Sequence, residues 1–70
     1  MLKIEVRAIN DALCADIVDY IWVKEDLSDF ERAQKIFREV DDWMRDYCED
    51  KDDEEYVGQY RIEILGISKE

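Results

Sequence analysis

The 70-residue chain contains no histidine, threonine or proline, and only two glycines, two serines and two cysteines. Without an imidazole, a serine or cysteine nucleophile lacks its usual general base, and neither cysteine has basic neighbours at helical or strand spacing to activate it. Gly58 and Gly66 are isolated and form no loop that could cradle a phosphate. We therefore expect no enzymatic activity and no cofactor.

One acidic stretch begins like a calcium-binding loop, with Asp50 and Asp52 at the first and third positions. The sixth position requires glycine and is Glu55, and the twelfth requires glutamate and is Arg61. These departures exclude an EF-hand, and we expect no metal site. Weak, unspecific binding of divalent cations by clustered carboxylates is the alternative.

Long apolar runs are also missing. The longest, Tyr20 to Val23, has four residues, so neither a membrane span nor a signal peptide is predicted. Cys14 and Cys48 do not form a secreted disulfide framework, and they fit a reducing cytoplasm. Because 47% of the residues are apolar, we expect one small folded domain over residues 1–70.

Charge of one sign dominates the chain, with twenty acids against ten bases and a net charge of −10. Residues 49–55 alone hold six acids and one base. This segment is a tenth of the chain and carries half of its excess negative charge. Such a balance disfavours binding to nucleic acid or to anionic membranes, because phosphate contacts need Lys and Arg. It favours a basic partner, or simply solubility.

Two strands are predicted in the first third of the chain. Residues 2–8 alternate between apolar and charged side chains, and 12–24 is rich in β-branched and aromatic residues. Asn10-Asp11 predicts a tight turn between them. This turn pairs Ala8 with Leu13, Val6 with Ala15, and Ile4 with Ile17, each pair apolar on one face. A helix over 10–20 is the alternative.

The same register places Asp19 on the core face opposite Leu2 and leaves Tyr20 and Trp22 on the outer face of the sheet. An exposed aromatic pair flanked by charge is typical of a protein-interaction surface. A bulge near Asp19 would instead turn both aromatic side chains inward and place the acid in solvent. We favour the bulge, because it removes a buried carboxylate.

Residues 28–48 are predicted to form one long amphipathic helix. Ser28 and Glu31 match a capping box at its start. Apolar residues follow at spacings of three and four, with two more that widen the stripe: Phe30, Ala33, Phe37, Val40, Met44 and Tyr47, with Ile36 and Trp43. Three ion pairs at i,i+4 are expected on the other face: Glu31–Lys35, Lys35–Glu39 and Arg45–Glu49.

A third strand is predicted over 60–66, where apolar and charged residues alternate again. The order is then β-β-α-β, and a helical crossover returns the last strand antiparallel to the first. We expect an α+β fold with a three-stranded antiparallel sheet, in strand order 2-1-3, and the helix packed on one face.

The candidate partner-binding residues are acidic side chains on the helix and in the run that follows it. Acids are unfavourable at a helix C-terminus, so a run placed there suggests a role beyond stability. Spacings of three and four repeat the helical carboxylates every 5–6 Å or so, of the same order as phosphates along a DNA strand. The residues are Glu39, Asp42, Asp46, Glu49, Asp50, Asp52, Asp53, Glu54 and Glu55, with Tyr20 and Trp22 as secondary candidates.

In size, charge and this acidic row, the chain resembles the small anti-CRISPR and DNA-mimic anti-restriction proteins of phages and mobile elements. The resemblance rests on no diagnostic motif. It implies a non-enzymatic inhibitor in the host cytoplasm that blocks DNA binding by a CRISPR effector complex. A Lys/Arg-lined channel of a type I surveillance complex would be a fitting partner. The alternative is an adaptor or antitoxin-like module that uses the aromatic sheet face or a free strand edge.

Overall fold

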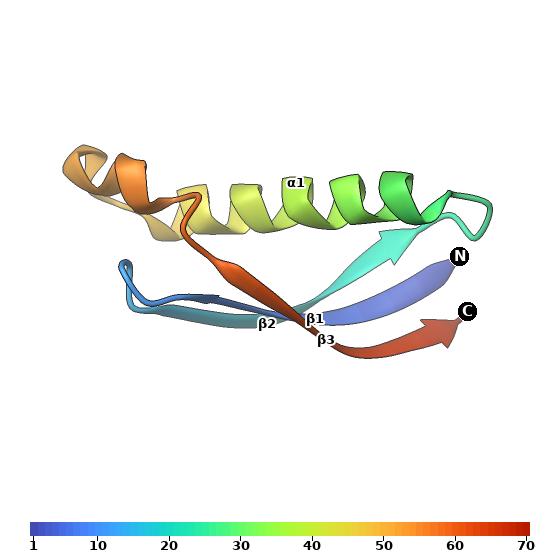
Figure 1. The fold of residues 1–70 in the computed structure, drawn as a ribbon. Helices are drawn as coiled ribbons and strands as arrows, with labels where there is room; N and C mark the ends of the chain where they lie inside the picture. The colour runs from blue at the N-terminus through green and yellow to red at the C-terminus, as the bar shows by residue number, and fades with distance from the viewer.

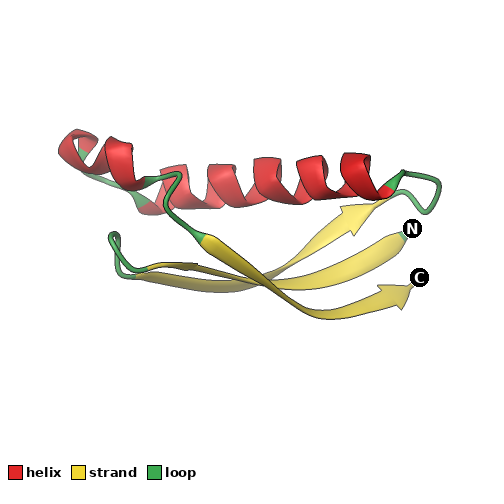
Figure 2. Cartoon of the chain, viewed as in Figure 1, coloured by secondary structure: helices red, strands yellow, loops and turns green.

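The computed structural model describes all 70 residues, and a three-stranded sheet and one long helix make up most of it. The elements in chain order are β1 (Leu2–Asn10), β2 (Ala15–Val23), α1 (Asp29–Tyr47), the 3₁₀ helix η1 (Lys51–Tyr56) and β3 (Arg61–Lys69). The antiparallel strands lie in the order β2-β1-β3, and α1 covers one face of the sheet (Figures 1 and 2). This confirms the predicted α+β fold and strand order.

The core lies between α1 and the even-numbered face of β1, where alternate side chains point toward the helix. Its buried members come from β1, β2, α1 and the residue after η1, and none comes from β3: Ile4, Val6, Ala8, Ala15, Ile21, Val23, Ile36, Val40, Met44 and Val57. The helix begins as predicted, because the Ser28 hydroxyl accepts a hydrogen bond from the Glu31 amide at 3.2 Å.

The β1–β2 register differs from the prediction by four residues. Ala8 lies opposite Ile17 instead of Leu13, and the connecting turn spans 11–14 instead of 10–11. Asn10 stays in the strand and its side chain accepts a hydrogen bond from the Leu13 amide, while Cys14 adopts a left-handed φ of 55°. A shift of four residues keeps every side chain on its face, so the apolar pattern could not distinguish the two registers. The alternative helix over 10–20 is wrong.

The bulge that we favoured near Asp19 is also wrong, since β1 and β2 pair without interruption. Asp19 lies on the helix side of β2 opposite Val6, yet it is exposed, whereas Ala15, Ile21 and Val23 on the same side of this strand are buried. Its carboxylate accepts a hydrogen bond from the Tyr20 amide at 2.7 Å. Tyr20 and Trp22 therefore remain on the outer face, half-exposed.

The bulge of this sheet lies in β3 instead. Glu5 pairs with Gly66 while Val6 pairs with Ile64, so Leu65 is an extra residue on β3. Beyond the bulge the strand continues to Lys69, three residues past the predicted end at Gly66.

The apolar stripe of α1 is wider than the core that it covers. Ile36, Val40 and Met44 are buried, whereas Phe30 and Phe37 are 72% and 54% exposed. Tyr47 is also exposed. The prediction that the whole stripe packs inward is therefore only partly correct.

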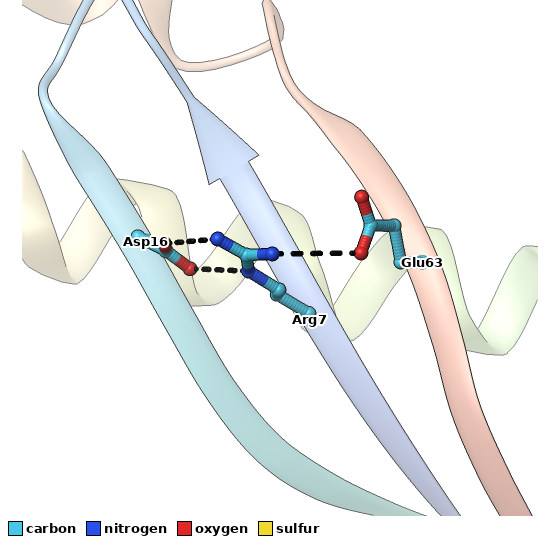
Figure 3. Close-up of polar contacts among 3 residues, drawn as sticks. All are labelled: Arg7, Asp16 and Glu63. Carbon is cyan, nitrogen blue, oxygen red and sulfur yellow. Dashed lines mark hydrogen bonds and ion pairs between the residues drawn. The ribbon is translucent and has the colours of Figure 1, made fainter.

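Arg7 connects all three strands on the outer face of the sheet (Figure 3). Its Nε and a terminal nitrogen donate to the two carboxylate oxygens of Asp16 on β2 at 2.9 and 2.6 Å, and its other terminal nitrogen lies 3.7 Å from Glu63 on β3. The hydrogen bond from Arg7 lowers the pKa of Asp16 below its ordinary value, and the same bond raises the pKa of the guanidinium. These contacts of Arg7 with Asp16 and Glu63 link the three strands on the outer face, and we call them the clamp.

The molecule is elongated, with extents of 39 × 18 × 15 Å. Figure 1 shows both chain termini and the start of α1 at one end, and η1 and the 11–14 turn at the other. No helix combines the length and apolar character that crossing a bilayer requires.

Candidate functional site

The predicted acidic residues gather at the end of the molecule formed by the last turns of α1 and by η1 (Figure 1). We call this set of nine residues the acidic surface: Glu39, Asp42, Asp46, Glu49, Asp50, Asp52, Asp53, Glu54 and Glu55. All are exposed except Glu39, which is half-buried. Residues 39–55 carry ten acids and two bases, so this segment holds −8 of the net charge of −10.

The acidic run has more local support than the sequence suggested. α1 ends at Tyr47, and 51–56 form a new 3₁₀ turn, so Asp52, Asp53 and Glu54 lie at the start of η1 and not at the end of a helix. Negative charge is favoured at a helix start, and Asp50 caps it by accepting a hydrogen bond from the Asp52 amide at 3.0 Å. The argument that the run violates a helix-end preference is therefore wrong for these three residues.

Buried contacts hold η1 against the rest of the fold. Asn10 is fully buried, and its amide nitrogen donates to the Tyr56 carbonyl oxygen at 2.7 Å. Val57, directly after η1, packs into the core. The Tyr47 hydroxyl donates to the Cys14 carbonyl oxygen at 3.0 Å, which ties the end of α1 to the β1–β2 turn. The acidic run is thus anchored at both of its ends.

Almost none of this negative charge is neutralised within the chain. Glu39 pairs with Lys35 at 3.6 Å, and none of the other eight acidic-surface residues forms an ion pair. The predicted Lys35–Glu39 pair is confirmed, whereas Glu31–Lys35 and Arg45–Glu49 are absent. Apart from Lys35–Glu39, every ion pair involves the sheet strands, the N-terminus or the segment before α1.

Between η1, the end of α1 and the β1–β2 turn lies an open hollow of about 690 Å³. Carboxylates of Asp46, Glu49, Asp50 and Asp53 line it together with the two free cysteines, Cys14 and Cys48. No group of three or more acidic or cysteine side chains converges closely enough to hold a metal ion. The hollow enlarges the negatively charged end without forming a coordination site.

The pKa values of two tyrosines near the acidic surface are raised, one of them by a residue of that surface. A hydrogen bond with Glu55 raises the pKa of Tyr56, and the charge of that carboxylate adds to the effect. Burial, followed by a hydrogen bond with Asp41, raises the pKa of Tyr60 well above its ordinary value. Both phenols are therefore neutral near pH 7.

The secondary candidates form a separate surface on the outer face of the sheet. The Lys3 ammonium lies 4.2 Å from the ring centre of Tyr20 and 5.4 Å from that of Trp22. A hydrogen bond with Glu5 raises the pKa of the Tyr20 hydroxyl. This aromatic patch belongs to β1 and β2, whereas the acidic surface belongs to α1 and η1, so the two do not form one site.

Sequence reasoning missed Asn10, a residue that holds η1 and so supports the part of the acidic surface that η1 carries. It was assigned to a turn because asparagine tolerates positive φ, but it is the only buried polar residue. The available signal was its position: residue 10 continues the even-numbered core face of residues 2–8, and a polar residue there needs hydrogen-bond partners.

Comparison with protein-family models, with curated proteins and with solved structures found no match for this chain.

Proposed function

We propose that this chain is a non-enzymatic inhibitor that binds the basic DNA-binding surface of a CRISPR effector complex in the cytoplasm. The acidic surface would occupy the place of DNA phosphates. The observation that carries the proposal is that eight of its nine carboxylates have no ion-pair partner in the chain. A helix face that is only solvated does not need so many unpaired carboxylates. A channel lined by Lys and Arg would supply cations to pair with them.

The arrangement of the carboxylates supports the same proposal. Asp42 and Asp46 lie one turn apart on a helix, and η1 extends the row beyond the helix end. Because Asn10 and Val57 hold η1 in place, little side-chain or loop ordering would be needed on binding. Carboxylates presented on anchored helical segments could take the place of phosphates in a duplex-binding groove.

The test is competition for DNA in an electrophoretic mobility shift assay with purified type I surveillance complexes and a labelled target duplex. The wild-type chain should displace the duplex. A variant with the acids at positions 42, 46, 52 and 53 changed to Asn should compete more weakly. At about 0.5 kcal/mol per exposed charge, four changes correspond to roughly 2 kcal/mol, or about thirtyfold in affinity.

A matched control removes four exposed acids from the opposite end of α1, namely Glu25→Gln, Asp26→Asn, Asp29→Asn and Glu31→Gln. Glutamine at position 31 preserves the capping box. The net charge changes equally in both variants. Because Glu25 also pairs with the N-terminal ammonium and with Lys69, a thermal melt of each variant checks that the control stays folded. Equal weakening of the two would refute a localised mimic, and unchanged competition by the acidic-surface variant would refute the proposal.

A second candidate function is a protein-interaction adaptor that uses the aromatic patch. Its supporting observation is that Tyr20 and Trp22 lie half-exposed on the outer face of the sheet, which no helix covers. Large aromatic side chains are frequent anchors of interfaces. Trp22→Ala should abolish partner binding under this alternative and leave it unchanged under the first proposal.

A further inference from the structure

The helix-side face of β3 is apolar and largely uncovered. Ile64 and Ile67 lie opposite Val6 and Ile4, so all four side chains share one face of the sheet. Val6 and Ile4 are 0% exposed beneath α1, whereas Ile64 and Ile67, one strand further out, are 48% and 54% exposed. The helix packs against β2 and leaves this strip open.

Two aromatic residues of α1 border the same strip. The Phe37 ring centre lies 6.3 Å from that of Tyr60, which directly precedes β3, so this flank of α1 faces β3. Phe30 is two turns earlier on the same side of the helix. Together, Phe30, Phe37, Ile64 and Ile67 form an exposed apolar surface that we call the β3 face.

The two edges of the sheet are not equally protected. On β2, Asp19 places a carboxylate on the helix side of the edge strand and binds the Tyr20 amide, which discourages pairing with another strand. On β3, the helix-side residues 62, 64 and 67 are all isoleucine, and a charge appears only at the last residue, Lys69. The outer backbone groups of β3 have no strand partner.

We propose that the β3 face binds a second copy of this chain through antiparallel β3–β3 pairing about a two-fold axis between Leu65 and Gly66. In this register Ile64 lies opposite Ile67 of the second copy. On the outer face, Glu63 lies opposite Ser68 and Arg61 opposite Glu70 of the second copy. The Ile64–Ile67 pairs are apolar and the Arg61–Glu70 pairs join opposite charges, which stabilises cross-strand pairing, while Ile62 lies opposite Lys69 of the second copy.

The charge distribution permits this pairing despite the net charge of −10. Residues 61–70 contain two acids and two bases and are neutral, in contrast to residues 39–55. Antiparallel pairing directs the two acidic ends away from each other along molecules 39 Å long. Their repulsion is screened beyond a Debye length of about 10 Å at 0.1 M salt. Phe30 and Phe37 of both copies would line the space between the two helices.

The test is to measure the molar mass of the full chain in solution by analytical ultracentrifugation over a wide range of protein concentration. We expect twice the 8.5 kDa chain mass for the wild type and 8.5 kDa for Ile64→Lys, which copies the protection that Asp19 gives to β2. Val18→Lys, at an equally exposed apolar residue on the outer face of β2, is the matched control and should remain dimeric. Circular dichroism checks that each variant is folded.

A charge-reversal pair tests the register without touching the apolar residues. Arg61→Glu should weaken the dimer, and Arg61→Glu combined with Glu70→Arg should restore it. This pair also decides the outcome if Ile64→Lys fails to fold. A wild-type chain that stays monomeric at every concentration would overturn the proposal, as would a dimer that Val18→Lys dissociates and Ile64→Lys does not.

Discussion

Asn10 should be the polar residue on which the position of η1 depends most. It is fully buried, its amide nitrogen donates to the Tyr56 carbonyl oxygen at 2.7 Å, and its carbonyl oxygen accepts from the Leu13 amide at 3.1 Å. Asn10→Ala removes both bonds and leaves the Leu13 amide without its partner. At about 1 kcal/mol for each bond, plus the cost of the unpaired group, we expect a loss of roughly 2–4 kcal/mol.

That loss is large for a 70-residue domain, whose total stability is expected to be about 4–10 kcal/mol. At about 4–8 °C per kcal/mol for a domain of this size, the melting temperature should fall by roughly 8–32 °C. Urea unfolding followed by circular dichroism gives the free energy of unfolding. Amide hydrogen exchange at Asp53 and Val57 reports whether η1 loosens, since these amides donate to the carbonyls of the N-cap Asp50 and of Glu54.

The control is Asp11→Ala, at an exposed neighbour whose side chain forms no hydrogen bond or ion pair. It should change the stability by no more than about 0.5 kcal/mol. Asn10→Asp keeps the shape but replaces the amide donor with a carboxylate facing the Tyr56 carbonyl oxygen, so it should also destabilise. Equal unfolding midpoints for Asn10→Ala and Asp11→Ala would refute the claim that Asn10 anchors η1.

Two further predictions concern pH. Because Arg7 lowers the pKa of Asp16 in the folded state, the clamp stabilises the fold above the ordinary carboxyl pKa and this contribution is lost as pH falls through the folded value. Urea unfolding of wild type and Arg7→Gln should therefore differ at pH 7 and converge in acid, once pH falls below the lowered pKa of Asp16; a difference that persists when this carboxyl is protonated would contradict this. Burial raises the pKa of Tyr60, so stability should decline as pH rises above about 10. Tyr60→Phe should reduce that decline in alkaline unfolding experiments, and an unchanged decline would argue against a protonated, partly buried phenol at this position.

The fold was predictable because its apolar patterns are strong and local. Residues 2–8 alternate with period two, and the helical stripe begins at a capping box, so element types and strand order follow with few alternatives. The β1–β2 register was not predictable, because Ile17 and Leu13 satisfy the same face of the sheet opposite Ala8. In the observed register Asn10 donates a tertiary hydrogen bond to Tyr56, 46 residues away, and a local apolar pattern carries no information on such a contact.

The acidic surface could be located from the sequence, but its environment could not. Charge counting identified 49–55, whereas the 3₁₀ turn that makes acids favourable at 52–54 depends on the chain returning to β1. The β3 face was also hidden, because the helical pattern of Phe30 and Phe37 is the same whether the stripe is covered or exposed. The sheet is only three strands wide, and this leaves their flank of α1 without a covering strand.

The most direct test of the acidic surface as a DNA substitute is the salt dependence of its affinity for a type I surveillance complex, measured between about 50 and 200 mM salt. The account predicts that the logarithm of the affinity falls steeply and linearly with the logarithm of salt concentration. The variant with Asn at positions 42, 46, 52 and 53 should give a shallower slope, and the matched control at positions 25, 26, 29 and 31 should keep more of the wild-type slope. An affinity that does not change with salt, or a slope that the two variants alter equally, would contradict it.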